Sequence, residues 1–284
     1  DLVRSRGLGD VYKRQIILFI EAFLAVNINA GEAVDSTFTI NSVKGKLAMH
    51  LQLPEADRAE LPVVIICHGL TGNQNQRFIS TIANDLLKEG IGVIRFDFNG
   101  HGQSDGDFQE MDVYNEMEDL RNVIAWVEKQ PFTKNISLVG HSLGGIVVGM
   151  VAPEIGKDKI KALVLLASGG VAPDLMLSGN FFGIRFDPWN VPEYLEMAGG
   201  KRLGRSYIET MRDLPIYQTA AKFDGRTLVV NGMHDRIVPY NYAIRYHEVM
   251  PNSELMLIEG DNHDFSATNY MSAAKIAKWI KDRL

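Results

Sequence analysis

The chain has 284 residues, of which 46% are hydrophobic and 23% are charged, a composition typical of a folded globular protein. Its formal net charge of −6 gives no reason to expect a nucleic acid or an anionic membrane surface as a partner. The single cysteine, Cys67, excludes an internal disulfide and any multi-cysteine metal site. Because Cys67 ends an apolar run, we expect its thiol to be buried.

The N-terminal region is interpreted separately from the fold. Residues 1–15 are basic and end in GDVYKRQ, which resembles the translation of a transposon-end sequencing adapter, so we interpret them as a non-native assembly scar. Residues 16–33 combine an apolar run, too short to span a bilayer, with small residues near its end. This pattern predicts a signal peptide whose start is lost, and hence a periplasmic or secreted protein. The alternative is an amphipathic helix on a cytoplasmic protein.

From residue 34 to residue 284 the sequence predicts one domain. The expected strands, which begin with a hairpin, are 37–40, 47–53, 63–67, 91–96, 136–139, 163–167, 228–230 and 255–258. The expected helices are 78–87, 113–127, 144–150, 243–250 and 273–280. Such alternation predicts the α/β class with a mostly parallel, doubly wound sheet. Ligands of these sheets bind beyond the carboxyl ends of the strands, so residues that directly follow strands are the functional candidates.

Residues 170–223 break this alternation. They are rich in aromatic residues and proline and contain no clean strand pattern. A structureless loop of that length is uncommon in a compact domain. We therefore predict an inserted cap that folds over the ends of the strands.

The motif GHSLGG, residues 140–145, follows the strand 136–139 and precedes a helix. G-x-S-x-G in that context is typical of a nucleophile elbow, in which a serine occupies a strained bend. Side chains at the flanking glycines would collide with the neighbouring strand and helix. The motif therefore predicts Ser142 as a nucleophile; the alternative is a tight turn that happens to contain a serine.

A serine needs a base to become a nucleophile, and proteins with a nucleophile elbow carry the serine, the acid and the histidine in that order along the chain. His263 follows the strand 255–258, at the edge where Ser142 is expected, whereas His247 falls within a predicted helix. Asp235 follows the strand 228–230 and is predicted to orient His263. The other acids considered, interpreted as loop charges, turn caps or residues at the wrong end of the sheet, are Asp224, Asp261 and Asp264.

A serine nucleophile also requires backbone donors for the oxyanion that forms during acyl transfer. Leu143 follows the nucleophile, and Leu70 lies in HGLTGN, residues 68–73, directly after the strand 63–67. We predict that these two N–H groups form the oxyanion hole. The glycine-rich stretch RFDFNGHGQSDG, residues 95–106, also follows a strand, and we interpret it, with His101, as scaffold near the site.

Together HGLTGN, RFDFNGHGQSDG, GHSLGG, the late Asp235 and EGDNHDF (residues 259–265) resemble the bacterial feruloyl (cinnamoyl) esterases of the α/β-hydrolase superfamily. The resemblance extends from about Phe38 to the C-terminus. It implies the α/β-hydrolase fold with an inserted cap, and a serine esterase that releases ferulic, p-coumaric or caffeic acid from plant cell-wall esters. It also implies that no metal or cofactor is needed.

The resemblance further implies a cap tyrosine that binds the phenolic hydroxyl, and Tyr207 in GRSYIE matches that position best. Asp174 lies near an acidic position of the family, and Phe182 stands where some members have glutamine. His141, which adjoins Ser142, is a fourth candidate for substrate binding.

The expected partners are small-molecule or oligosaccharide hydroxycinnamate esters, with no nucleic acid and no membrane, and a homodimer is left open. Alternatives on the same fold are a short-chain carboxylesterase, an acetyl-xylan esterase or a monoacylglycerol lipase. A serine peptidase and a noncatalytic ligand-binding protein are more distant alternatives.

Overall fold

The computed structural model describes residues 33–55 and 60–284. The interpreted assembly scar and all but the last residue of the interpreted signal peptide lie outside these residues. The strands are β1 (Val34–Ser42), β2 (Gly45–Leu53), β3 (Leu61–Cys67), β4 (Gly92–Phe96), β5 (Thr133–His141), β6 (Ile160–Leu166), β7 (Asn180–Phe181), β8 (Ile184–Arg185), β9 (Tyr194–Glu196), β10 (Arg202–Gly204), β11 (Arg226–Gly232) and β12 (Ser253–Ile258). The helices are α1 (Arg77–Lys88), η1 (Phe108–Glu110), α2 (Val113–Glu128), α3 (Leu143–Ile155), α4 (Ala172–Ser178), η2 (Ala198–Gly200), α5 (Arg205–Asp213), α6 (Ile216–Ala220), α7 (Asn241–Val249) and α8 (Asn269–Lys281).

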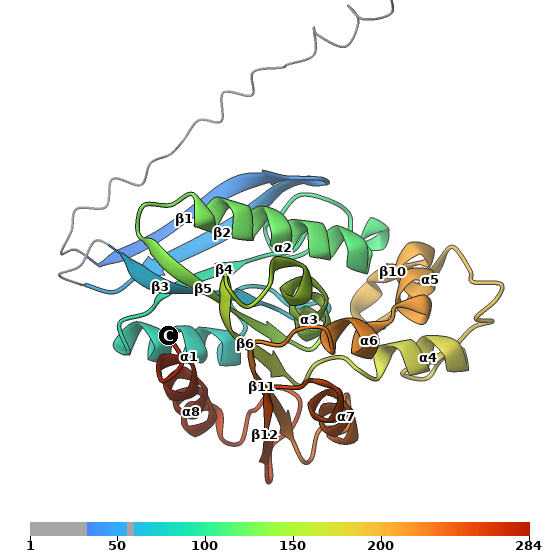
Figure 1. Ribbon diagram of the computed structural model, residues 1–284. Helices are drawn as coiled ribbons and strands as arrows, with labels where there is room; N and C mark the ends of the chain where they lie inside the picture. Colours follow the sequence, from blue (N-terminus) through green and yellow to red (C-terminus); the bar gives the residue numbers. More distant parts are fainter. Residues whose placement is uncertain (1–32, 56–59) are drawn as a thin grey trace, which may run out of the picture.

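Within this part of the chain, eight strands form one sheet in the order β1-β2-β4-β3-β5-β6-β11-β12 (Figure 1). β1 pairs with β2 and β2 with β4 in antiparallel fashion, and the other neighbours are parallel. Every strand and helix predicted outside the cap overlaps an observed element, and the mostly parallel α/β sheet is confirmed.

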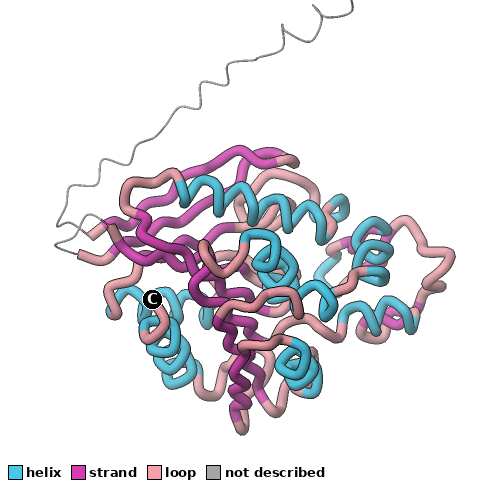
Figure 2. The backbone as a smooth tube through the Cα atoms, viewed as in Figure 1, coloured by secondary structure: helices cyan, strands magenta, loops and turns pink. Residues whose placement is uncertain are grey.

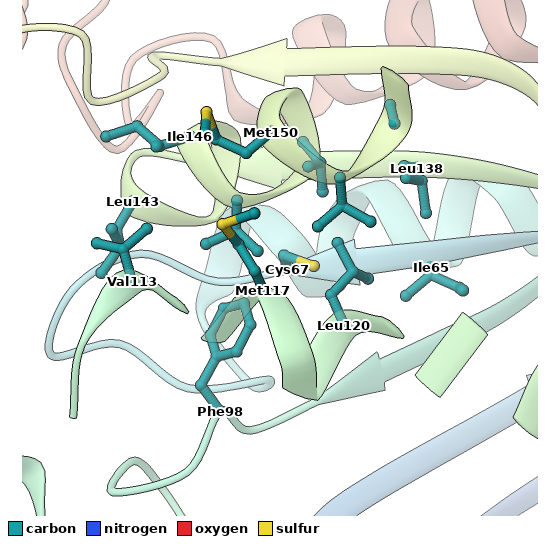
Figure 3. Packing of buried hydrophobic residues seen from close by; sticks show 14 of the residues in the cluster. Ile65, Cys67, Phe98, Val113, Met117, Leu120, Leu138, Leu143, Ile146 and Met150 are labelled. Atoms are coloured by element: carbon teal, nitrogen blue, oxygen red, sulfur yellow. The ribbon is translucent and has the colours of Figure 1, made fainter. Parts of the chain in front are cut away.

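Helices cover both faces of the sheet, as the tube in Figure 2 shows. Successive residues of β3 alternate between two apolar clusters: Val63 and Ile65 pack toward α2 and α3, and Val64 and Ile66 pack toward α1 and α8. Because both faces are covered, every residue of β3 is buried. Figure 3 shows part of the first cluster, in which Leu143 of α3 lies beside Val113 of α2, and Met117 of α2 lies near Cys67 of β3. Cys67 is part of this cluster, which confirms the predicted buried thiol.

The cap, residues 170–223, leaves the sheet after β6 and returns to it at β11 (Figure 1). It contains α4, α5 and α6 together with two small antiparallel ribbons, β7–β8 and β9–β10. The expectation of no strand in this region was wrong in detail. These strands are two or three residues long, which is too short to produce an alternating pattern in the sequence.

The cap is attached to the segment that precedes α2. A Cβ added to Gly204 would lie 1.9 Å from the carbonyl oxygen of Gln109, so only glycine permits this approach. The Ser206 hydroxyl donates a hydrogen bond of 2.7 Å to Asp112, and the Lys201 ammonium lies 4.5 Å from the centre of the Phe108 ring. These contacts fix the start of α5 beside the segment that precedes α2. No helix in residues 33–55 or 60–284 has the length and apolar character needed to cross a membrane.

The turn between β5 and α3 brings three backbone segments into close contact. Ser142 has a φ of 55°, in the left-handed region that non-glycine residues rarely adopt. A Cβ on Gly140 would lie 2.2 Å from the carbonyl oxygen of Gly144, and one on Gly144 would lie 2.5 Å from that of His68. The two glycines therefore let α3 begin directly against β3 and β5, with Ser142 raised on the bend between them.

We predict that Gly144→Ala lowers the free energy of unfolding by at least about 2 kcal/mol, because the new methyl group meets backbone atoms that cannot move aside. Gly149→Ala, later in α3, is the matched control. Its Cβ would have no neighbour nearer than 3.8 Å, and alanine favours a helix interior over glycine by about 1 kcal/mol. Urea denaturation measures both changes, and equal effects would contradict this account of the turn.

Candidate active site

Three polar side chains meet at the carboxyl ends of the parallel strands. Ser142 follows β5, Asp235 follows β11 and His263 follows β12. His263 Nε2 lies 3.0 Å from Ser142 Oγ, and His263 Nδ1 lies 2.8 Å from Asp235 Oδ2. Because a carboxylate only accepts, Nδ1 donates to Asp235, which leaves Nε2 free to accept the serine proton. The structure thus brings together the three residues that the motifs predicted.

Asp235 is held in place by backbone donors. Its Oδ1 accepts hydrogen bonds of 2.8 Å from the N–H groups of Ile237 and Val238, and its other oxygen faces His263. The carboxylate is buried, so each of these donors stabilises its charge in the absence of water. Asp235 therefore fixes the imidazole in one tautomer and one orientation.

The other acids near the site have different partners. Asp261 is buried; its carboxylate accepts from Thr268 and from the N–H of Ala267, and its carbonyl accepts from the N–H of His234. Asp261 therefore shapes the loop that carries His263. Asp224 is exposed and paired with Lys157, away from the triad. Asp264 lines the cavity, but its side chain makes no hydrogen bond to His263 or to Asp235 among the described residues.

The predicted oxyanion donors lie beside the serine. Leu143 is the first residue of α3, where N–H groups have no partner within the helix and the helix dipole favours negative charge. The backbone of Gly69 approaches Ser142 so closely that an added Cβ would lie 2.9 Å from the serine Cβ, and Leu70 follows it. Neither the Leu70 nor the Leu143 N–H donates a hydrogen bond within residues 33–55 and 60–284. Both donors are thus available to an oxyanion bound next to Ser142.

His68 holds the Leu70 loop, a role that the motif HGLTGN did not reveal. Its Nδ1 donates to the Gly69 carbonyl at 2.8 Å, and its Nε2 accepts from the Phe98 N–H at 3.1 Å. Burial lowers the pKa of His68 to about 4, so the ring is neutral and both nitrogens can keep these roles at neutral pH.

The stretch 95–106, predicted as scaffold, also holds this loop. Asp97 accepts from the Gln74 N–H at 2.7 Å, and Arg95 donates to the Gln74 carbonyl at 2.8 Å. His101 is buried, with its Nδ1 3.2 Å from the Asn99 carbonyl, and it makes no hydrogen bond to Ser142, Asp235 or His263 among the described residues. These contacts tie the end of β4 to the segment between β3 and α1.

A cavity of about 310 Å³ opens above Ser142, between the sheet and the cap. Its apolar wall is formed by α3 and by the beginning and middle of the cap; these side chains are Ile146, Val171, Ala172, Leu175, Phe181, Phe182 and Met197. The sequence showed only that the cap is rich in aromatic residues, because nothing in a linear pattern identifies which of them face a cavity.

Tyr207 and Phe182 both line this cavity, in different ways. Tyr207 is buried, and its hydroxyl has no hydrogen-bond partner among the described residues. Burial, and then the charge of Glu116, raises the Tyr207 pKa, so the phenol keeps its proton as a donor. Phe182 is half exposed and lies at the mouth of the cavity.

The placement of Asp174 and His141 differs from what substrate binding requires. Asp174 does not line the cavity; its carboxylate accepts a 2.9 Å hydrogen bond from the Tyr242 hydroxyl. The resemblance suggested Asp174 by position along the chain, but α4 turns this side chain toward α7. His141 lines the cavity, yet its Nε2 lies 2.9 Å from the carbonyl oxygen of His263 and is occupied there.

The described residues include no group of three or more His, Cys, Asp or Glu side chains arranged to hold a metal ion. What the site contains is a serine hydroxyl hydrogen-bonded to a carboxylate-oriented imidazole, two free N–H donors and an apolar cavity. This arrangement can activate the hydroxyl for attack on a carbonyl carbon.

Comparison with known proteins agrees with the fold. Residues 62–188 match a family model described as the alpha/beta hydrolase fold. The chain is similar to Est1E from Butyrivibrio proteoclasticus in its complex with ferulic acid, with a TM-score of 0.83 and 28% identity over 87% of this chain and 98% of that one. On this evidence and the sheet order, the chain has the α/β-hydrolase fold.

Two curated relatives are similar to the chain in sequence. An uncharacterized 31.7 kDa protein from the traX-finO intergenic region of Escherichia coli is 37% identical over 121 residues, which is 42% of this chain and 41% of that protein. The chain therefore matches less than half the length of that relative. The mitochondrial palmitoyl-protein thioesterase ABHD10 of Rattus norvegicus is 24% identical over 218 residues, 73% of this chain and 70% of that protein.

We predict that Asp235→Asn slows covalent labelling of Ser142 by a fluorophosphonate by about 10³–10⁴-fold, because the amide no longer selects the productive tautomer of His263. Asp224→Asn removes an exposed carboxylate away from the triad and is expected to label like the wild type. Labelling rates measured by intact-mass spectrometry compare the two variants. A wild-type rate for Asp235→Asn would show that another acid orients the base.

Proposed function

We propose that the protein is a serine esterase that hydrolyses esters of hydroxycinnamic acids through an acyl-enzyme on Ser142. The observation that carries the proposal is the pair of hydrogen bonds from Asp235 through His263 to Ser142, at the base of a largely apolar cavity. The likeness to Est1E, solved with ferulic acid, supports the choice of acyl group.

The proposed reaction has two halves. His263 takes the proton of Ser142 as its Oγ attacks the ester carbonyl, and the N–H groups of Leu70 and Leu143 stabilise the oxyanion. His263 then gives that proton to the departing alcohol, which leaves the acyl group on Ser142. Water, deprotonated by His263, attacks the acyl-enzyme, and collapse of the second tetrahedral intermediate returns the serine proton from His263. Each oxyanion donor contributes on the order of 3 kcal/mol to such a reaction.

The shape and chemistry of the cavity support an aromatic acid. Aliphatic and aromatic side chains from α3 and the cap offer a large apolar surface, which suits a flat ring. Tyr207 adds one hydroxyl without an internal partner, and such a group can hydrogen-bond a phenolic oxygen. Export, as proposed from residues 16–33, would bring this activity to cell-wall esters outside the producing cell.

A second candidate is the hydrolysis of long-chain acyl thioesters. The relative ABHD10 is a palmitoyl-protein thioesterase, and the apolar wall of the cavity accepts an alkyl chain as well as a ring. The Tyr207 hydroxyl favours the phenolic acid, because a saturated chain would leave this buried group unpaired.

A substrate panel separates these candidates. We expect methyl ferulate and methyl p-coumarate to be hydrolysed with a higher kcat/KM than p-nitrophenyl butyrate, monoolein or a palmitoyl thioester. Ser142→Ala is expected to lower the rate on all of them by at least about a thousandfold. A clear preference for the palmitoyl thioester would replace the proposed acyl group, and unchanged turnover by Ser142→Ala would remove the proposed nucleophile.

The role of Tyr207 has its own test. Tyr207→Phe is expected to lower kcat/KM about 3- to 10-fold for methyl p-coumarate, the range of one neutral hydrogen bond, and to leave methyl cinnamate, which has no phenolic hydroxyl, almost unchanged. Tyr194→Phe, a cap tyrosine outside the cavity lining, should affect neither ester. Equal losses on both esters for Tyr207→Phe would assign Tyr207 to packing alone.

A further inference from the structure

His141 is the last residue of β5 and directly precedes Ser142. The residue is 5% exposed, and its Nε2 lies 2.9 Å from the carbonyl oxygen of His263. A carbonyl oxygen only accepts, so Nε2 carries the proton and donates it to this bond. The ring of His141 therefore binds the backbone of the very residue that is predicted to act as the base.

The other nitrogen of His141 faces the loop that carries the predicted oxyanion donor. A Cβ added to Gly69 would lie 3.4 Å from His141 Nδ1 and 2.9 Å from the Cβ of Ser142. The His141 ring thus lies between the Leu70 loop on one side and the His263 loop on the other. Its ring centroid is 4.8 Å from that of His263, at an interplanar angle of 44°.

The loop that carries His263 is attached firmly on both sides of that residue. Before it, Asp261 binds Thr268 and the backbone of Ala267; after it, Phe265 stacks on Phe78 with ring centroids 4.4 Å apart. Between these attachments, His141 supplies the one hydrogen bond that the His263 backbone makes among the described residues. Without it, the His263 backbone would have no hydrogen bond of its own among the described residues.

The donor is also stable through a catalytic cycle. Burial, and then the neighbouring His263, lowers the pKa of His141 to about 3. When His263 becomes an imidazolium, His141 therefore stays neutral and keeps its Nε2 proton on the carbonyl. A second cation 4.8 Å from the imidazolium would oppose its formation.

We propose that His141 is a positioning residue: its Nε2–H holds the His263 backbone so that the imidazole stays in register with Ser142. This inference rests on the proposed serine chemistry of Ser142 and assigns His141 no contact with substrate. Because the effect passes through His263, it should appear in the rate of acylation and not in the affinity for an ester.

Three substitutions of His141 test the proposal, because they differ in whether the new side chain places a hydrogen-bond donor where Nε2 lies. Phenylalanine has no donor, asparagine has a donor that does not reach the place of Nε2, and glutamine has one that does. We expect His141→Phe and His141→Asn to slow fluorophosphonate labelling of Ser142, and kcat on p-nitrophenyl acetate, by about 10- to 100-fold, as for other residues that orient a functional histidine. KM should stay within about 2-fold, and His141→Gln should recover the rate to within about 3-fold of wild type.

His247→Phe is the matched control, because His247 is a half-buried histidine of α7 that bonds Ser253 at 2.9 Å, away from the cavity. It should label like the wild type. If His141→Phe fails to fold by circular dichroism, the asparagine and glutamine variants carry the comparison. If His141→Asn is labelled as fast as the wild type, or if His141→Gln is labelled slowly, the positioning role alone is overturned. Absence of labelling in the wild type overturns the proposed function as well.

Discussion

The site depends on the close approach of three backbones at the turn between β5 and α3. Gly144 lies against the carbonyls at the end of β3, which leaves no room for any side chain. This packing holds Ser142 in a left-handed conformation that costs on the order of 1–3 kcal/mol and persists only because its surroundings fix it. The same contact brings the Leu143 N–H beside the loop of Leu70. The proposed nucleophile and the proposed oxyanion donors are therefore positioned by the same backbone contacts.

The histidines around this turn differ in whether a carboxylate is their partner. His68 and His141 have no carboxylate partner, so desolvation keeps them neutral, and each donates one hydrogen bond to a backbone carbonyl. His263 alone is paired with a buried carboxylate, that of Asp235. The proposed mechanism thus moves the Ser142 proton to the one ring of these three that has a carboxylate partner, while the two neutral rings hold the loops on either side.

The chemistry and the specificity come from different parts of the fold. The strand ends supply the proposed nucleophile, base and oxyanion donors, and the cap supplies most of the apolar wall, including Phe181 and Met197, together with Tyr207. Proteins of this fold that are similar to the chain include one solved with ferulic acid and one named as a palmitoyl-protein thioesterase. Such divergence is expected where a fixed catalytic framework carries a variable cap.

The sequence by itself determined the sheet, because buried parallel strands give long apolar runs. It also identified Ser142, Asp235 and His263 as candidates for one site, because each follows such a strand. It did not determine the small strands of the cap, which are too short for a period to be seen, or the direction of Asp174, which α4 turns toward Tyr242. Nor did it show that His141 bonds a residue far along the chain. Local periodicity reports which face of an element is buried, whereas contacts between loops are decided only when the tertiary structure brings the strand ends together.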